Sequence, residues 1–275
     1  MRIRLAGLTI VLTGLLLAEI SILAQAGRGG AAQAPAYRAP RTKDAKPNLN
    51  GVWQAITEAN WNIEPHSAAP GPMWQLGAAY AVPPGLGIVD GGSLPYKPDA
   101  LAKKKQNFDN RASQDPEAKC YLPGVPRAMY MPFPFQIIQS TDHIMMAFSY
   151  AGALRTIYMK KTEAPADSWM GWSNGRWEGE TLVIDTDSFN DLSWFDRSGN
   201  YHSDKMKVVE RITATGPDHL LYEATIDDPV VFTRPWKVSI PLYRRKEPNA
   251  QILEFKCIEF SEDLIYGHLR KVPLK

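Results

Sequence analysis

The polar side chains in and beside the segment 169–203 are of the types needed for proton transfer on a small molecule. His202 follows two carboxylates, Asp191 and Asp196, along this segment. An imidazole whose pKa lies near neutrality suits acid/base catalysis when carboxylates are close to it. The residues predicted to be catalytic are His202, Asp196, Glu210, Arg155 and Tyr158. A second interpretation stays open for His202, in which the ring only bonds to the backbone of its loop.

Aromatic side chains are concentrated around the same segment, and they predict a pocket for an apolar or aromatic molecule. The residues predicted to bind this ligand are Trp169, Trp172, Trp177, Asp191, Trp194, Tyr222 and Trp236. A carbohydrate is the alternative ligand. For that ligand the stacking platforms would be the exposed rings of Trp169, Trp172 and Trp194.

Other kinds of chemistry lack their motifs. The sequence has no glycine-rich phosphate loop, dinucleotide fingerprint, Gly-x-Ser-x-Gly elbow or His-Glu-x-x-His pair. The histidines are scattered, and the acidic run 185–196 lacks the spacing and the glycine of a calcium loop. Ser203 beside His202 is no nucleophile pair, because neighbouring residues on a strand point to opposite faces. We therefore expect neither a cofactor nor a metal.

Short segments rich in β-branched and aromatic residues must position these side chains. Strands are predicted at 51–56, 135–140, 143–150, 154–159, 181–186, 206–215, 219–227, 236–244 and 253–259, and one helix at 98–108. Closely spaced strands with a single helix indicate an all-β fold. We expect an antiparallel barrel of the lipocalin or calycin type or a two-sheet sandwich, with one short helix and long irregular N-terminal insertions.

Alternation along the strands predicts which side chains share a face. Trp236, Val238, Ile240 and Leu242 fall on one face of their strand. Glu210 falls on the same face as Val208 and Ile212, where a carboxylate is costly unless it is paired. Glu210 is therefore expected to line a polar interior or to pair with a guanidinium group, the candidates being Arg211, Arg234 and Arg155.

The N-terminus has the pattern of a secretory signal peptide. Arg2 and Arg4 precede an apolar run over 5–24, and 24–26 (AQA) is a small-x-small cleavage pattern. A membrane anchor is the alternative, because about 20 apolar residues can span a bilayer. We expect a signal peptide over 1–26, a disordered leader over 27–46 and a single barrel-like domain over 47–275. The mature protein is expected in the periplasm or outside the cell.

Charge and cysteine content bear on the partners and on the scaffold. The formal net charge is +2, which gives no electrostatic reason to expect nucleic acid or, after signal cleavage, a membrane as partner. The expected partner is a small-molecule ligand or substrate, and the oligomeric state stays open. Cys120 and Cys257 are expected to form a disulfide, since exported proteins mature in oxidising compartments. Two buried free thiols are the alternative.

Several sequence blocks occur in one order along most of the chain. They are 120–127 (CYLPGVPR), 133–139 (FPFQIIQ), 155–159 (RTIYM), 175–186 (GRWEGETLVIDT), 189–190 (FN), 194–196 (WFD), 202–203 (HS), 209–211 (VER), 232–236 (FTRPW) and 254–257 (EFKC). With these blocks the chain resembles a widespread family of uncharacterised secreted bacterial β-rich proteins. The resemblance implies an exported β-rich domain and no particular activity.

Two local features qualify this resemblance. Family members often carry Asp-Gly-Arg-x-His-Pro where this chain has 160–165 (KKTEAP), so any mechanism that needs that imidazole is in doubt here. The Gly51-Val-Trp53 start is similar to that of lipocalin barrels, where the tryptophan plugs the closed end. An ordinary first strand with a buried tryptophan fits these three residues equally well.

The leading hypothesis is an exported enzyme that performs cofactor-free acid/base chemistry on an apolar or aromatic compound in a barrel pocket. The reaction would be of the isomerase, cyclase or lyase type. The alternatives are a periplasmic small-ligand-binding protein without catalysis and a carbohydrate or cell-envelope interaction domain.

Overall fold

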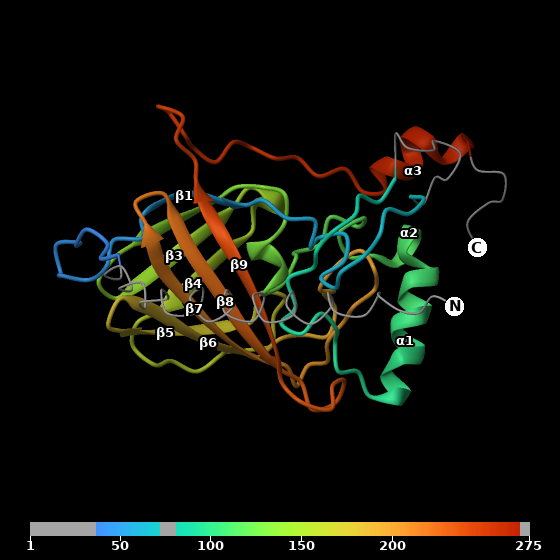
Figure 1. Ribbon diagram of the computed structural model, residues 1–275, viewed down its shortest axis with the longest axis horizontal. Helices are drawn as coiled ribbons and strands as arrows, with labels where there is room; N and C mark the ends of the chain where they lie inside the picture. The colour runs from blue at the N-terminus through green and yellow to red at the C-terminus, as the bar shows by residue number, and fades with distance from the viewer. Residues whose placement is uncertain (1–36, 72–80, 270–275) are drawn as a thin grey trace, which may run out of the picture. The chain divides into compact units, whose positions relative to one another are not determined.

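The computed structural model describes residues 37–71 and 81–269. Nine strands form a closed barrel in which each strand pairs with its neighbours along the chain (Figure 1). They are β1 (Gly51–Ala55), β2 (Phe135–Gln139), β3 (His143–Phe148), β4 (Leu154–Tyr158), β5 (Trp172–Glu178), β6 (Thr181–Asp187), β7 (Lys207–Gly216), β8 (His219–Asp227) and β9 (Trp236–Arg244). The predicted all-β fold is confirmed, and of the two architectures considered it is the closed barrel.

One strand pair departs from the antiparallel arrangement. β1 closes the barrel by pairing antiparallel with both β2 and β9, whereas β4 and β5 run parallel through Ile157↔Ser173 and Tyr158↔Asn174. Parallel neighbours need a long connection because the chain must return to the same end of the sheet. Residues 159–171 supply that connection.

The sequence analysis missed one strand and predicted another that does not form. The segment 172–178 forms β5, although its only buried side chain is that of Ser173, so the usual alternation of apolar residues is absent. Residues 253–259 form no strand and are mostly exposed. The barrel is already closed by β9 and β1, so no sheet edge remains for the last segment to join.

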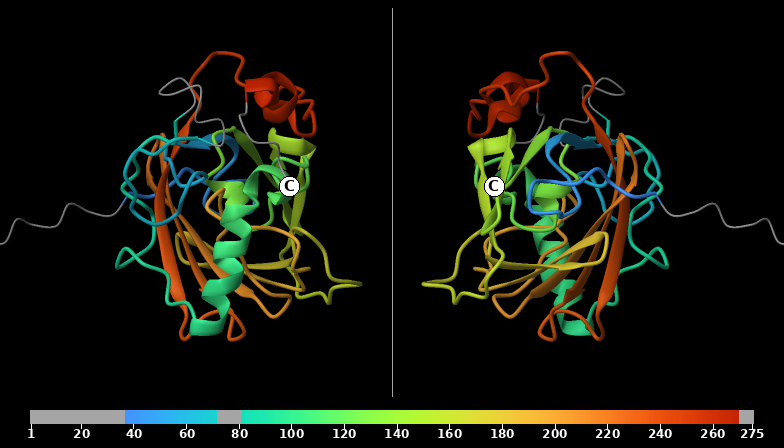
Figure 2. Two further views of the ribbon diagram at one scale, coloured as in Figure 1. Left: turned by 90° about the vertical axis from the view of Figure 1, so that its right-hand side faces the viewer. Right: turned by 90° about the vertical axis from the view of Figure 1, so that its left-hand side faces the viewer.

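The helices gather at one end of the barrel. The predicted helix is confirmed as α1 (Pro98–Asp109), which begins with a proline in its first turn and carries Asp99 beside it. It lies across the end of the barrel (Figure 2, left). Two further short helices, α2 (Arg111–Gln114) and α3 (Ser261–Tyr266), have no sequence signal of their own because they span only one turn or slightly more. Within the described residues no helix is long and apolar enough to cross a membrane.

The expected signal peptide and the first part of the leader, 27–36, lie outside the described residues. The remainder of the leader, 37–46, is placed on the barrel, and the expectation of disorder there is corrected. Ala39 is buried in the core and Tyr37 packs against it, while the Thr42 hydroxyl bonds to the Lys46 carbonyl and closes a turn. These contacts supply the burial that the composition of the leader did not suggest.

The predicted alternation is confirmed in β9, where Trp236, Val238, Ile240 and Leu242 are buried. Trp53 of the Gly-x-Trp start is fully buried, and its indole N–H donates to the Leu49 carbonyl at 2.9 Å. The Arg244 guanidinium lies over the Trp53 ring at 4.1 Å. β1 and β9 are thus joined by a side-chain contact as well as by their ladder.

A buried ion pair fills the interior between five consecutive strands. Arg155 of β4 donates through Nη1 to Glu210 Oε1 of β7 at 3.0 Å, and its Nη2 bonds to the other carboxylate oxygen. The remaining partners are polar side chains of β5, β6 and β8, namely Ser173, Thr186 and Tyr222. Burial alone would lower the pKa of Arg155, but Glu210 holds it above its ordinary value. Of the three guanidinium partners considered for Glu210, Arg155 is the one found.

Replacing Arg155 by Met is expected to lower the free energy of unfolding by about 3–5 kcal/mol, because Glu210 is then buried without a counter-charge. The double variant Arg155→Met/Glu210→Leu is expected to recover most of this loss, since no buried charge remains. Urea denaturation measures the free energy of unfolding of both variants. The matched control is Arg211→Met, which removes an exposed pair with Glu178 and is expected to cost far less. A double variant as unstable as the single one would contradict the argument.

The predicted disulfide between Cys120 and Cys257 is confirmed, with a Cα–Cα distance of 5.7 Å. It fastens the segment after β9, which runs along the outside of the barrel to α3 (Figure 1), to the region just after α2. A backbone bond from Phe260 N–H to the Ala118 carbonyl, at 2.8 Å, supports the same attachment.

Reduction of this bond is expected to lower the melting temperature, because the bridge joins residues separated by 137 positions. The loop-entropy relation puts the upper limit of the effect at ~5 kcal/mol. Calorimetry with and without reductant measures the shift, and a Cys120→Ser/Cys257→Ser variant provides the control because reductant should leave it unchanged. Equal melting temperatures for oxidised and reduced protein would refute this expectation.

Candidate functional site

Two concavities flank α1 and α2 at the helical end of the barrel. The first, called here the His202 groove, has a volume of about 640 Å³ and runs between α1 and the loop before β7. The second, called here the aromatic cavity, has a volume of about 390 Å³ and lies between α2, the segment 61–70 with Val82, and the segment 255–262. Volumes of this order match small-molecule sites.

Four of the predicted site residues line the His202 groove, namely Trp169, Asp191, Trp194 and His202. Trp169 packs against Tyr121 with ring centroids 5.1 Å apart, and Asp191 is exposed. Trp194 is only 8% exposed, so it offers an edge of its ring and no open face. The opposite wall consists of polar side chains of α1.

Both ring nitrogens of His202 have partners inside the protein. Nδ1 lies 2.9 Å from the Ser203 carbonyl, which can only accept, so Nδ1 carries the proton. Nε2 therefore accepts from the Ser193 hydroxyl at 2.7 Å. Burial lowers the pKa of His202 and keeps the ring neutral. Ser193 is itself buried, and a Cβ at Gly124 would clash with its hydroxyl, so this pair is enclosed by the chain.

Asp196 is completely buried and organises the loop that contains it. Its carboxylate accepts bonds from the backbone N–H groups of Ile63, Ser198 and Asn200 and from the Asn200 amide. Burial raises the pKa of Asp196 to about 6. Because four donors already surround the carboxylate, its evident role is to fix the loop 196–200 against residues near 63.

The remaining predicted residues lie in other places. Arg155, Glu210 and Tyr222 are sealed in the barrel interior and line neither concavity. Tyr158 is three residues beyond the inward-facing Arg155 on the same strand, so its side chain faces outward. There its ring stacks on that of Trp172, with the ring centroids 4.7 Å apart. Trp177 is partly buried and borders a shallow hollow near Arg41, and Trp236 packs edge-on to Phe195 and Phe232 in the core. Of the five predicted catalytic residues, Arg155 and Glu210 are brought together in the barrel interior, and neither concavity gathers the set.

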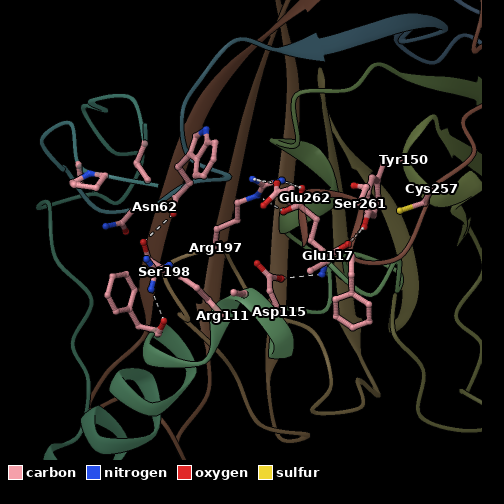
Figure 3. Close-up of a pocket in the computed structure, with 18 of the residues that line it drawn as sticks. Asn62, Arg111, Asp115, Glu117, Tyr150, Arg197, Ser198, Cys257, Ser261 and Glu262 are labelled. Atoms are coloured by element: carbon pink, nitrogen blue, oxygen red, sulfur yellow. Dashed lines mark hydrogen bonds and ion pairs between the residues drawn. The ribbon is translucent and has the colours of Figure 1, made fainter. Parts of the chain in front are cut away.

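The aromatic cavity is lined by none of the residues predicted to be catalytic or to bind the ligand, although Cys257 of the predicted disulfide borders it. Figure 3 shows side chains that line it, among them Tyr150. The aromatic rings of its walls come from five separate segments, namely Trp61, Phe108, Phe133, Tyr150, and Phe255 with Phe260. Three of these rings form one continuous wall, since the ring centroid of Phe255 lies 4.9 Å from that of Phe133 and 5.7 Å from that of Tyr150. These segments show no regular periodicity, so the only sequence signal was the aromatic content of otherwise irregular stretches.

The floor of the aromatic cavity is a carboxylate held between two guanidinium groups. Glu117 accepts from Arg197 through Nη2 at 2.8 Å and Nε at 2.9 Å, and from Arg127 Nη2 at 2.6 Å. The Asn60 amide donates to the same carboxylate, and Arg127 also pairs with Asp115. Burial alone would raise the pKa of Glu117, but Arg197 and Arg127 outweigh it and lower the pKa to about 2.

Arg197 connects this floor to the wall. Its guanidinium lies 4.4 Å from the centroid of the Trp61 ring and also reaches Glu262 at 3.1 Å. The charges on the floor therefore neutralise one another before any ligand binds. In the part of the chain that the structure describes, no group of three or more His, Cys, Asp or Glu side chains could hold a metal ion.

The low pKa of Glu117 predicts a pH-dependent contribution to stability. A carboxyl group whose pKa is lower in the folded than in the unfolded chain stabilises the folded state. The full contribution is present at pH values above the ordinary pKa of 4.5, and it is lost as the pH falls toward 2. The contribution is about 3 kcal/mol at neutral pH. Glu117→Gln is therefore expected to be less stable than the wild type at pH 7, with the gap closing in acid.

Urea denaturation at several pH values between 7 and 3 measures this gap. The control is Glu262→Gln, which also removes a partner of Arg197 but from a side chain that is 37% exposed. This variant is expected to follow the wild type at every pH. A gap between wild type and Glu117→Gln that stays constant with pH would show that Glu117 is not the group responsible.

Comparison with known proteins adds no assignment. No family model matches the chain, and no similar curated protein was found. The function is therefore argued from the side chains and from the two concavities.

Proposed function

We propose that this chain is an exported binding protein that holds a small apolar or aromatic molecule in the aromatic cavity, without catalysis. The observation that carries the proposal is a preformed, aromatic-walled cavity above the Glu117 floor. Aromatic rings supply large apolar contact area, and fixed polar groups at one side of a pocket orient the ligand.

The site geometry favours binding over acid/base chemistry. A general base must present a free atom within hydrogen-bond reach of the substrate. Both nitrogens of His202 are engaged, Asp196 is surrounded by donors, and the Arg155–Glu210 pair is buried in the barrel. In the aromatic cavity, Glu117 has a pKa of about 2 and is bonded to two guanidinium groups, so it is a poor proton acceptor.

Export is supported by the disulfide and by the N-terminal sequence pattern. Disulfides persist in oxidising compartments such as the periplasm and the extracellular space. The proposed partner is a small molecule, with neither nucleic acid nor a membrane surface as a partner of the mature chain, in keeping with its nearly balanced charge.

The proposal predicts that a neutral apolar fluorophore, N-phenyl-1-naphthylamine, binds the oxidised protein at one site. The expected Kd is on the order of 10⁻⁴ M or tighter, since ligands of this size gain about 0.3 kcal/mol per non-hydrogen atom. Fluorescence titration measures it. Phe255→Ala removes one ring of the wall from a partly exposed position, so it should weaken binding severalfold while leaving the fold intact.

The matched control is Trp169→Ala, which removes a half-buried ring that packs at a tilt against Tyr121 in the His202 groove and should leave the titration unchanged. If Trp169→Ala weakens binding and Phe255→Ala does not, the ligand site is the groove and the proposal fails. Absence of saturable binding refutes it as well. Mass spectrometry of the ligand after prolonged incubation tests the catalytic alternative, which predicts a chemical change of the bound molecule.

A further inference from the structure

The aromatic cavity contains one cation that has no acidic partner. Arg111 of α2 lines the cavity, and its guanidinium donates one bond, from Nη1 to the Phe108 carbonyl at 2.7 Å. Among residues 37–71 and 81–269, no carboxylate lies within ion-pair distance of it. By contrast, Arg197, the other arginine of the lining, pairs with both Glu117 and Glu262.

The surroundings of Arg111 are apolar on one side. Its guanidinium lies 4.0 Å from the centroid of the Phe108 ring, and in Figure 3 the Arg111 side chain extends away from Asp115. Burial lowers the pKa of Arg111 and is the main influence on it, with Asp109 and Asp115 acting against it from a distance. Among the described residues only one N–H group of this guanidinium has a partner, so the others are free to bind an anion.

We propose that the ligand of the aromatic cavity carries a carboxylate and that Arg111 binds this group. The inference rests on the proposed function and adds the chemical class of the ligand: an apolar or aromatic body with one carboxylate. A planar guanidinium matches a carboxylate with two parallel bonds, and it does so best where water is excluded. The rings of the wall take the apolar body, and the Glu117 floor needs no counter-charge from the ligand.

The charges of the residues that line the cavity favour a ligand with a carboxylate over a cationic ligand. Each carboxylate of the lining already has a basic partner: Asp115 pairs with Arg127, Glu117 with Arg127 and Arg197, and Glu262 with Arg197. A ligand cation would have to displace one of these pairs and would meet Arg111 as a like charge. A ligand carboxylate finds an unpaired cation in Arg111, while the three carboxylates of the lining are already held by Arg127 and Arg197.

The test compares 2-naphthoate with 2-naphthamide, which have the same shape and differ in charge, by titration calorimetry on the oxidised protein. Wild type is expected to bind the carboxylate at least about tenfold more tightly than the amide. Arg111→Met should remove this preference and leave the amide affinity within about twofold. Arg111→Lys keeps the charge without the planar fork and should retain only part of the preference.

Three outcomes separate the two proposals. Binding of the amide with no preference for the carboxylate overturns the role of Arg111 and leaves the binding function standing. Failure of both compounds, and of the neutral fluorophore, overturns the binding function itself. A preference that survives Arg111→Met moves the anion site to another cation and refutes the assignment, provided that the melting temperature shows the variant to be folded.

Discussion

A carboxylate buried between two guanidinium groups holds the helical end of this barrel together. Glu117 and Arg127 lie in the connection from α2 to β2, and Arg197 lies in the loop before β7, so one ion cluster joins two distant parts of the chain. Asn60 adds a third. Each charge depends on the others, because removing one would leave a mostly buried ion with fewer counter-charges. The shape of the aromatic cavity therefore follows from electrostatics as much as from apolar packing.

The charges buried in the barrel interior are likewise held by their counter-charges. Arg155 and Glu210 lie on non-adjacent strands, and their hydrogen bonds extend to β5, β6 and β8. This cluster spans the parallel pair β4–β5, whose ladder contains only two residue pairs. A short ladder of that kind gains order from side chains that reach across it. Polar groups thus fix the strand order at the place where backbone pairing is weakest.

Alternation was sufficient to predict most of the barrel and the inward direction of Glu210, because a half-buried strand must place every second side chain in the core. It failed at β5, where serine, asparagine and glycine supply no apolar period, and at 253–259, where a strand-like composition meets a closed sheet. The candidate site was harder to predict from the sequence. His202, Asp196 and Arg155 have the chemistry of a catalytic site, but buried partners satisfy each of them. The aromatic cavity comes from irregular segments whose proximity only tertiary packing creates.

The disulfide fixes one wall of the aromatic cavity. One wall, with Phe255 and Phe260, belongs to the segment that Cys257 fastens to Cys120, and Cys257 itself lines the cavity. A covalent bond therefore fixes the position of that wall before a ligand binds. A chain with both thiols reduced lacks this bond. On the proposed function, ligand binding would therefore depend on the redox state of Cys120 and Cys257.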